Sequence, residues 1–395
     1  MTRPLRVGFN AIFLEPGMGG LETYVMELVP ALLEAEPNLE LTVLCNSVGR
    51  EALECRPWAS SVALETPAGS RRGLRAAYEL GPLGALAGRR FDVLHSPALT
   101  APLATRAANV VVLADTTWIT VPDLNRGQAA TVRLWQAVVP LVARRADRAI
   151  AISQAGARDV ETHLGVAVER IDVVALGYAA GSRPAGTPGE ELRAGLGIGA
   201  GPIVLNVAVK KVHKNHLRLI QALPAVLAEV PNVRLVLPGG PTPYEERLRE
   251  EVARLGLDDH VHFPGYVDPA DLEGLYMEAA AFVFPSLNEG FGLPLLEAMA
   301  RGVPVVTSSE SALPEVAGDA ALLVDPHSVD QIAAATVTVL ADGEVRERLA
   351  LAGEQRVREF TWRRTAELTL ASWSRALAQR DRRRSRPARR WSRAG

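Results

Sequence analysis

The chain has 395 residues, of which 48% are hydrophobic and 22% charged, with a formal net charge of −2. This length predicts two domains, and the composition excludes a disordered chain. No apolar run reaches the roughly 20 residues that span a bilayer, no secretory pattern opens the sequence, and the two cysteines form no C-x-x-C pair, so we expect a cytoplasmic protein without disulfides or zinc.

Strand-like apolar runs alternate with helix-like segments through the first half of the chain. The predicted buried strands are Leu5–Asn10, Leu41–Cys45, Asp92–His95, Val110–Ala114 and Arg148–Ile152. A helix is predicted over Leu21–Glu34, where apolar residues recur every three or four positions. Residues 183–202, rich in Gly, Pro and Ala, are predicted to form a linker that contains a short helix.

The same alternation then begins again. The predicted strands are Ile203–Val207, Val233–Leu237, Val261–Phe263, Ala281–Phe284 and Pro304–Thr307. The predicted helices are Leu217–Ala228, Tyr244–Leu255, Asp271–Ala279 and Pro294–Arg301. This repetition is typical of the α/β class with two doubly wound, Rossmann-like units, in which ligands bind beyond the carboxyl ends of the strands.

The end of the sequence is strongly basic. Residues 380–395 hold eight arginines and one aspartate, a local charge of +7, so the rest of the chain carries −9. A cationic tail on an acidic body can meet anionic lipid, nucleic acid or another acidic surface. We expect peripheral contact with the cytoplasmic face of a membrane and no nucleic acid partner; the alternative interpretation is a solvated, disordered tail.

The segment between Pro285 and Pro304 is the most informative one, because it follows a predicted strand and opens a predicted helix. Gly290 and Gly292 permit a tight turn and close approach of a ligand to the backbone. The amino end of a helix that follows glycines is a natural seat for phosphate.

Within it, EGFGLPLLEAMARGVPVV, followed by ALPEVAGDAALLVDP, resembles the signature of the retaining glycosyltransferases of family 4. The resemblance covers roughly residues 4–375 and implies the GT-B fold, in which two Rossmann-like domains face each other across a cleft. In that family the first glutamate contacts the donor sugar and the second holds the ribose, so these roles fall on Glu289 and Glu297. The backbone of Phe291, Gly292 and Leu293 would meet the diphosphate or the sugar. From its position alone, Glu297 has a simpler alternative role, which is to cap the helix.

The chain has only three lysines among its 43 basic residues, and all three, Lys210, Lys211 and Lys214, fall within five residues. A compact, flexible ammonium suits a phosphate contact. The surrounding NVAVKKVHKNHLRLI resembles the family loop whose Arg or Lys neutralises the diphosphate, and Lys214 is the best match. His213 stands where the family often has an arginine, so Lys210 or Lys211 is the alternative second cation. Lys211 has the further alternative of being a plain surface residue.

Other segments agree with this family. HFPGYVD resembles the base-binding strand end and places Gly265, Tyr266 and Val267 beside the nucleobase. PGMGGLETY resembles the donor-side glycine loop, in which Gly19 and Gly20 match.

Three polar residues of the first half also follow predicted strands. His95 matches the family histidine near the donor sugar, with a purely structural role as the alternative. Asp115 is retained from a family His-Asp pair whose histidine is Ala114 here. Ser153 lies at a similar strand end, where helix capping is the alternative role.

The resemblance therefore implies domains over 1–182 on the acceptor side and over 203–362 for the nucleotide sugar, a helix over 363–378 that returns to the first domain, and a disordered basic tail over 379–395. The remaining histidines form no cluster with carboxylates, and no Asp-x-Asp pair follows a strand, so neither a metal nor a cofactor is expected.

The implied reaction transfers a hexose with retention from a nucleoside-diphosphate sugar to a hydroxyl acceptor, with Glu289, His95 and Lys214 as the catalytic candidates. GDP-mannose is the favoured donor, because the Lys-Asn pair of the lysine loop is similar to that of mannosyltransferases. The basic tail favours a lipid-linked acceptor, in glycan, glycolipid or cell-surface polysaccharide synthesis. The alternatives are a sugar-nucleotide epimerase or a phosphorylase on the same fold, and a non-catalytic two-domain protein that binds sugar nucleotides.

Overall fold

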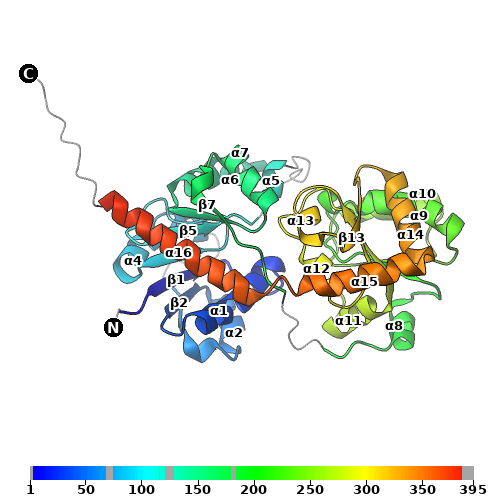
Figure 1. The fold of residues 1–395 in the computed structure, drawn as a ribbon, viewed down its shortest axis with the longest axis horizontal. Helices are drawn as coiled ribbons and strands as arrows, with labels where there is room; N and C mark the ends of the chain where they lie inside the picture. The colour runs from blue at the N-terminus through cyan, green and yellow to red at the C-terminus, as the bar shows by residue number, and fades with distance from the viewer. Residues whose placement is uncertain (1–2, 68–73, 115, 121–128, 179–183, 385–395) are drawn as a thin grey trace, which may run out of the picture. The chain divides into compact units, whose positions relative to one another are not determined.

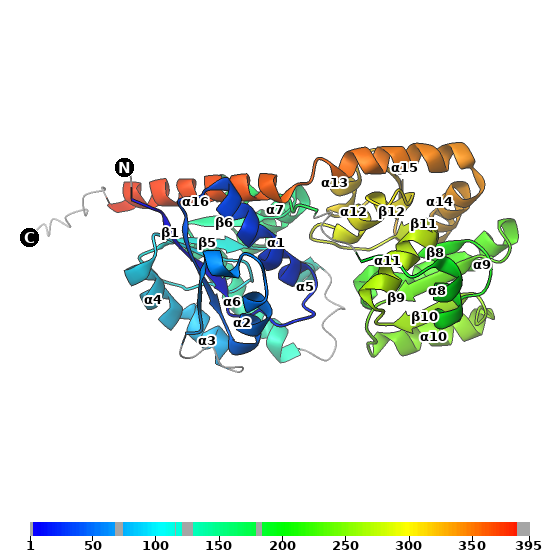
Figure 2. The same cartoon turned by 90° about the horizontal axis from the view of Figure 1, so that it is seen from below.

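The computed structural model describes the chain apart from residues 1–2, 68–73, 115, 121–128, 179–183 and 385–395 (Figure 1). The chain forms two compact units, the first within residues 1–114, 130–177 and 362–395 and the second within 115–129 and 178–361. Each unit has its own parallel sheet with helices on both faces (Figure 2). The predicted α/β class with two Rossmann-like units is confirmed.

The first sheet has, among the described residues, seven parallel strands in the order β3-β2-β1-β4-β5-β6-β7. Their bounds are β1 Arg6–Ala11, β2 Glu40–Cys45, β3 Ala63–Glu65, β4 Val93–Ser96, β5 Ala108–Val112, β6 Arg148–Ala151 and β7 Ile171–Val173. The central strands were predicted because each is a buried apolar run. The edge strands β3 and β7 were not, because three residues are too few to show a period.

The helices in the first unit are α1 Gly20–Ala35, α2 Ser47–Glu54, α3 Arg75–Leu80, α4 Pro82–Arg90, α6 Ala129–Arg145, α7 Gln154–Leu164 and α16 Trp362–Arg384. Leu83 and Ala87 of α4 pack in one core with Leu94 of β4. The next residue of β4, His95, faces Trp373 of α16 instead. Since successive side chains of a strand point to opposite faces, α4 and α16 cover opposite faces of this sheet.

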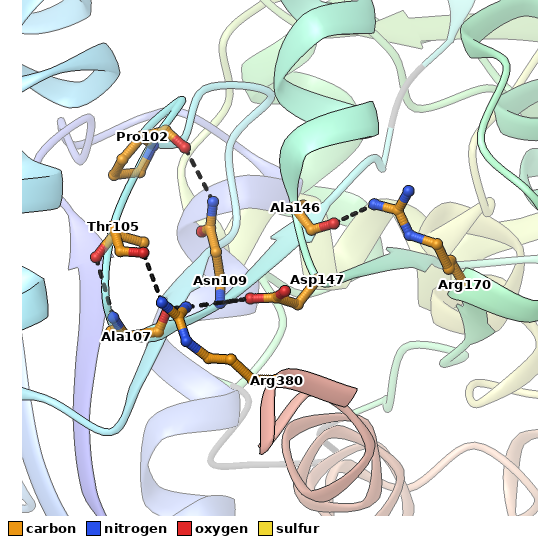
Figure 3. A network of polar contacts seen from close by, with 8 residues as sticks. All are labelled: Pro102, Thr105, Ala107, Asn109, Ala146, Asp147, Arg170 and Arg380. Atoms are coloured by element: carbon orange, nitrogen blue, oxygen red, sulfur yellow. Dashed lines mark hydrogen bonds and ion pairs between the residues drawn. The ribbon is translucent and has the colours of Figure 1, made fainter. Parts of the chain in front are cut away.

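Helix α16 packs against α1 and across β5 and β6 (Figures 1 and 2). It runs to Arg384, which corrects the prediction of a helix that ends at 378 and a disordered tail from 379. The reason is that Arg380 is anchored (Figure 3): its guanidinium donates to the carbonyl oxygens of Thr105, at 2.7 Å, and Ala107, and lies 3.4 Å from the Asp147 carboxylate. The predicted tail beyond Arg384 lies outside the described residues.

The second sheet has, in the described part of the chain, six parallel strands in the order β10-β9-β8-β11-β12-β13. They are β8 Ile203–Leu205, β9 Arg234–Pro238, β10 Val261–Gly265, β11 Ala279–Phe284, β12 Val305–Ser308 and β13 Ala321–Val324. The helices of this unit include α8 Gly189–Leu196, α9 His216–Glu229, α10 Tyr244–Leu255, α11 Pro269–Glu278, α12 Leu293–Met299, α13 Leu313–Ala317, α14 Val329–Ala341 and α15 Gly343–Val357; the short helix α5, Thr117–Thr120, is assigned to this unit too. One core joins α9, α10 and α14 to the strands through residues such as Leu223, Leu248 and Ile332.

The predicted linker is packed onto the second unit from Thr187 onward. Thr187 donates its backbone N–H to Ala270 at 3.1 Å and its hydroxyl to Asp271 at 2.6 Å, and Leu192 of α8 is buried. Gly274 permits this contact, because a Cβ there would lie 2.6 Å from the Thr187 carbonyl oxygen. Of the helices within the described ranges, none combines the length and the apolar character that crossing a membrane requires.

Candidate functional site

Each sheet has one point at which the order of its strands reverses. In the second sheet the chain runs from β8 outward through β9 and β10, then returns to β11 on the other side of β8. The loops after β8 and β11 therefore leave from neighbouring strands toward opposite faces, which opens a crevice where ligands of such sheets bind. Lys214 lies in the first of these loops and Glu289 in the second.

The structure brings these two predicted residues together. Lys214 Nζ lies 2.6 Å from Glu289 Oε1, and the two side chains are 19% and 11% exposed. Lys214 Nζ also lies 5.4 Å from the ring centroid of Phe284, the last residue of β11. An ammonium has three N–H donors, and this ion pair uses one, so the others are available to phosphate oxygens.

Hydrogen bonds hold the two loops together beneath this pair. Asn215 has a positive φ of 59°, and its side-chain amide donates to the carbonyl oxygens of Pro285 at 2.9 Å and Pro326 at 2.7 Å. The backbone N–H of Leu287 donates to the carbonyl of His213 at 2.7 Å. The Lys214–Glu289 pair is thus built on a fixed backbone and not on two independent loops.

The turn after Glu289 leads directly into α12. The backbone N–H of Glu289 donates to Ser311 Oγ at 2.9 Å. Gly292 precedes the helix with a φ of 113°, and a Cβ there would lie 2.8 Å from Leu313 Cδ2. No side chain caps α12, so the partial positive charge at its start faces the segment Phe291–Leu293, whose backbone was predicted to meet the donor.

Glu297 is held by a network that includes two residues not singled out in the sequence. Tyr276 of α11 donates its hydroxyl to Glu297 Oε2 at 2.8 Å. The Arg301 guanidinium lies 4.4 Å from the Tyr276 ring and donates to the Glu297 carbonyl oxygen at 2.6 Å. It also pairs with Glu273 at 2.5 Å. Burial and the neighbouring carboxylate raise the pKa of Tyr276, which therefore stays a hydrogen-bond donor.

This contact bears on the capping role of Glu297, which the structure does not show. The carboxylate binds a tyrosine of another helix and makes no capping hydrogen bond to α12. Arg301 was detectable as a partner, since it follows Glu297 by four residues in the predicted helix Pro294–Arg301. Tyr276 gave no signal, because nothing in the sequence shows that α11 packs beside α12.

Two predictions for the lysine loop are corrected. Lys210 is completely buried and donates to the Gly239 carbonyl at 2.5 Å, so its ammonium is bonded inside the unit and is not exposed for a phosphate. Burial lowers its pKa to about 8. His213 is also buried, and burial with the nearby charge of Lys214 lowers its pKa to about 3. Being neutral at physiological pH, His213 cannot be the second cation; Lys211, by contrast, is exposed.

The predicted base-binding segment lies at the end of β10. Gly265 has a φ of 75°, and its carbonyl accepts from the backbone N–H of Gly239 at 2.7 Å, which joins the ends of β10 and β9. Tyr266 is 81% exposed, the largest exposure among the large apolar and aromatic residues of the described chain. Val267 is half-buried beside it. An exposed aromatic ring at the carboxyl edge is suited to contact a planar base.

In the first unit the predicted glycine loop is open. Gly19 has a φ of 62° and directly precedes α1, and a Cβ at Gly19 or at Gly20 would meet nothing within 4 Å. The backbone N–H of Gly17 donates to Glu22 at 2.8 Å, which ties the loop to the first turn of the helix. This loop follows β1 at the switch point between β1 and β4.

His95 was predicted to orient the donor sugar, and the structure corrects this. The ring is completely buried, and Nδ1 accepts from the Trp373 indole N–H at 3.2 Å. Nε2 must therefore carry the proton, and it lies 3.1 Å from the Tyr24 hydroxyl. Burial lowers the pKa of His95 to about 3. With both nitrogens bonded inside the unit, His95 joins β4 to α1 and α16.

The remaining candidates are Ser153 and Asp115. Ser153 is buried and caps α7, since its Oγ accepts from the Gly156 N–H at 2.9 Å, so the capping role is the one observed. Asp115 lies outside the described residues. Among the described residues no group of three or more His, Cys, Asp or Glu side chains is arranged to hold a metal ion.

The parallel Rossmann-like sheets and the charged crevice of the second one define the class of nucleotide-binding α/β proteins. Comparison with known families makes this specific. Residues 18–179 match the model of Glycosyltransferase Family 4, and residues 189–356 match that of Glycosyl transferases group 1. The chain belongs to the family 4 glycosyltransferases.

Two curated relatives carry related names. O-antigen chain mannosyltransferase B of Escherichia coli is 37% identical over 170 residues, which are 43% of this chain and 45% of that protein. MMP alpha-(1->4)-mannosyltransferase of Mycolicibacterium hassiacum is 32% identical over 260 residues, 63% of this chain and 59% of that protein. The chain thus spans about half the length of the curated relatives it matches.

Solved structures show the same fold over the whole chain. Sucrose-phosphate synthase of Thermosynechococcus elongatus superposes with a TM-score of 0.72 at 20% identity, over 95% of this chain and 99% of that one. Anabaena HepE, in complex with UDP and glucose, has a TM-score of 0.72 at 21% identity, over 94% of this chain and 99% of that one. At these identities the likeness establishes the fold, which is that of GT-B glycosyltransferases.

Proposed function

We propose that this protein is a retaining glycosyltransferase that transfers a hexose from a nucleoside-diphosphate sugar to a hydroxyl group, without a metal ion or other cofactor. The observation that carries the proposal is the Lys214–Glu289 pair at the switch point of the second sheet, beside the uncapped start of α12. Family membership supports it, because both halves of the chain match glycosyltransferase models.

The chemistry requires two kinds of stabilisation. The bond between the anomeric carbon and the diphosphate breaks, so negative charge develops on the leaving group and positive charge on the sugar. Lys214 and the N–H groups at the start of α12 supply positive charge for the diphosphate, the task that a metal performs in other enzymes. Glu289 supplies a carboxylate for the sugar, and Glu297, held by Tyr276, has its other oxygen for the ribose hydroxyls.

For the donor we propose GDP-mannose. Several relatives are named mannosyltransferases, including the serotype-specific mannosyltransferase WbdA of Escherichia coli, 30% identical over 238 residues. The acceptor proposed is a hydroxyl group of a growing cell-surface glycan, linked to lipid. The protein would then work in the cytoplasm, in peripheral contact with the membrane through the arginines at the end of α16 and beyond it.

The test uses the lysine loop, which provides its own control. Lys214→Met and Lys211→Met each remove one lysine of this loop. The two lysines are three residues apart, but only Lys214 is paired with Glu289. We expect Lys214→Met to lower kcat by ~10²–10³-fold, as for other groups that stabilise developing charge. Lys211→Met should lower kcat far less than Lys214→Met, because Lys211 is exposed and is not paired with Glu289.

The assay incubates the purified protein with GDP-mannose, UDP-glucose, UDP-N-acetylglucosamine or dTDP-sugars and a lipid-extract acceptor. Released nucleotide and product mass are measured, and NMR of the new linkage reads its anomeric configuration. A donor that binds should also raise the free energy of unfolding by ~2.7 kcal/mol at 100 times its dissociation constant. A product of unchanged mass would identify an epimerase, and binding without turnover a non-catalytic protein; equal activity of the two lysine variants would also contradict the proposed site.

A further inference from the structure

Helix α6, Ala129–Arg145, exposes an apolar stripe on the first unit. Leu134 and Leu141 are 52% and 49% exposed, and a separation of seven residues brings them to the same side of a helix. Trp135, next to Leu134, is 36% exposed. Among the described residues, no other helix contributes three exposed large apolar side chains.

The opposite side of α6 fixes this orientation. Val139, Val142 and Ala143 are completely buried in the unit. The helix is therefore already packed through one apolar side, and its second apolar side, with Leu134 and Leu141, faces outward. Two apolar sides with exposed arginines between them distinguish α6 from an ordinary surface helix, whose outer side is polar.

The charges around the stripe have one sign. Arg133, Arg144 and Arg145 are exposed, and α6 contains no Asp or Glu. Arg145 follows Leu141 by four residues and so continues the line of the stripe. The surface complements a negatively charged, partly apolar partner.

A hollow of about 370 Å³ lies at the Arg145 end of the stripe. Arg145 and Arg380 bring two guanidinium groups to its wall, and Asp147, which also lines it, is already bonded to Arg380 (Figure 3). Asn109, in the same wall, is only 3% exposed, and its Oδ1 has no hydrogen-bond partner in the described structure. Arg145 gives the wall of the hollow a positive charge, whereas Asn109 Oδ1 is shielded from solvent.

We propose that α6 is a membrane-docking helix that binds an anionic phospholipid bilayer. Leu134, Trp135 and Leu141 enter the interface between headgroups and acyl chains, as in other helices that lie in the membrane plane. The arginines contact lipid phosphates, and the hollow between Arg145 and Arg380 receives one headgroup. At the wall of the hollow the lipid phosphate pairs with Arg145.

This inference deepens the proposed function, on which its purpose rests, because it names the surface by which the enzyme would reach a lipid-linked acceptor. The apolar stripe of α6 contains no residue of the basic tail, although Arg380, the first arginine of that tail, also lines the hollow. Vesicle binding is measured without donor or acceptor, so its failure would not be confused with a failure of the transferase proposal.

The experiment compares sedimentation of the full chain with phosphatidylglycerol-containing vesicles and with vesicles of phosphatidylcholine alone. The test variant is Leu134→Glu with Leu141→Glu. The matched control is Leu351→Glu, a leucine of α15 in the second unit that is 56% exposed. A chain truncated after Arg384 measures the part played by the tail, and circular dichroism confirms that each variant is folded.

We expect binding to the anionic vesicles only, a fall of about tenfold or more in the partition coefficient for the α6 variant, and no change for Leu351→Glu. The truncated chain should keep measurable binding. No binding by the wild type, or unchanged binding by the α6 variant together with its complete loss on truncation, would overturn the proposal. So would self-association that the α6 substitutions abolish in the absence of vesicle binding, because the stripe would then be an interface between copies of the chain.

Discussion

Acid should destabilise the second unit through two histidines that are buried without charge. Burial lowers the pKa of both His213 and His216 to about 3, and the neighbouring lysines contribute in the same direction. In the unfolded chain a histidine titrates near ~6.5. Between these values the unfolded state binds more protons than the folded state, so the free energy of unfolding falls as the pH drops below ~6.5 and the loss continues to about pH 3.

The magnitude follows from the separation of the two pKa values. For one such histidine, lowering the pH from 7 to 5 removes ~2 kcal/mol, and two remove ~4 kcal/mol, a large part of a typical domain stability of ~5–15 kcal/mol. Burial also lowers the pKa of His262, so this residue adds to the loss of stability in acid. The second unit should therefore unfold at clearly lower urea concentration at the lower pH.

His216→Met isolates the effect. The His216 side chain is completely buried, and neither ring nitrogen has a hydrogen-bond partner in the described structure, so an apolar replacement leaves no broken contact. This variant should lose only ~2 kcal/mol over the same pH range. His327→Met, at an exposed position of the same unit, is the control and should lose as much as the wild type.

The assay is urea unfolding at each pH, with hydrogen exchange of peptides from β8 and β11 to follow the second unit separately from the first. A loss of less than ~1 kcal/mol in the wild type would refute the assignment of neutral buried histidines. A loss that His216→Met does not reduce would refute the role of this residue.

Three further substitutions test the other contacts. Tyr276→Phe removes the hydrogen bond to Glu297, a bond to a charged group worth ~1.5–3 kcal/mol, and should raise the KM for the donor by about tenfold or more with little change in kcat, measured by steady-state kinetics. Gly292→Ala forces an L side chain to a φ of 113° and into a packed neighbour, and thermal unfolding should show a loss of ~1–3 kcal/mol. Arg380→Met removes the anchor of α16 and should destabilise the first unit by ~1–3 kcal/mol in urea, whereas the exposed Arg382→Met should change stability by less than ~0.5 kcal/mol.

The fold was predictable because its central strands are continuous apolar runs between amphipathic helices. β1, β8 and β11 carry that signal, and their order along the chain implies two doubly wound sheets. The edge strand β13 escaped prediction, since its four residues, of which Leu323 is exposed, do not stand out from the surrounding loop. The docked part of the linker escaped for a different reason, because its packing on α11 depends on a tertiary contact at Gly274.

The site was predictable to the extent that position along a strand decides the location of a residue. Lys214 and Glu289 follow neighbouring strands at the switch point, so strand order alone brings their loops together. His95 also lies at a strand end, but the last residues of a strand can face either side of the sheet. The residue that decided its role, Trp373, is 278 positions later in the chain, on the helix that returns to the first unit.

The difference between the place of a residue along the chain and the contacts of its side chain also explains the outcome for Lys210 and Glu297. Both belong to segments whose resemblance to the family is specific, yet a motif fixes the backbone and leaves the side chain to its neighbours. Lys210 turns to the carbonyl of Gly239, on the adjacent β9 edge, which removes it from the crevice. Glu297 is bound by Tyr276 through one oxygen, which leaves the carboxylate in a fixed orientation and makes its use as a ribose ligand depend on α11 as well as on α12. Tyr276→Phe therefore tests whether the second glutamate of the motif works alone or needs the neighbouring helix.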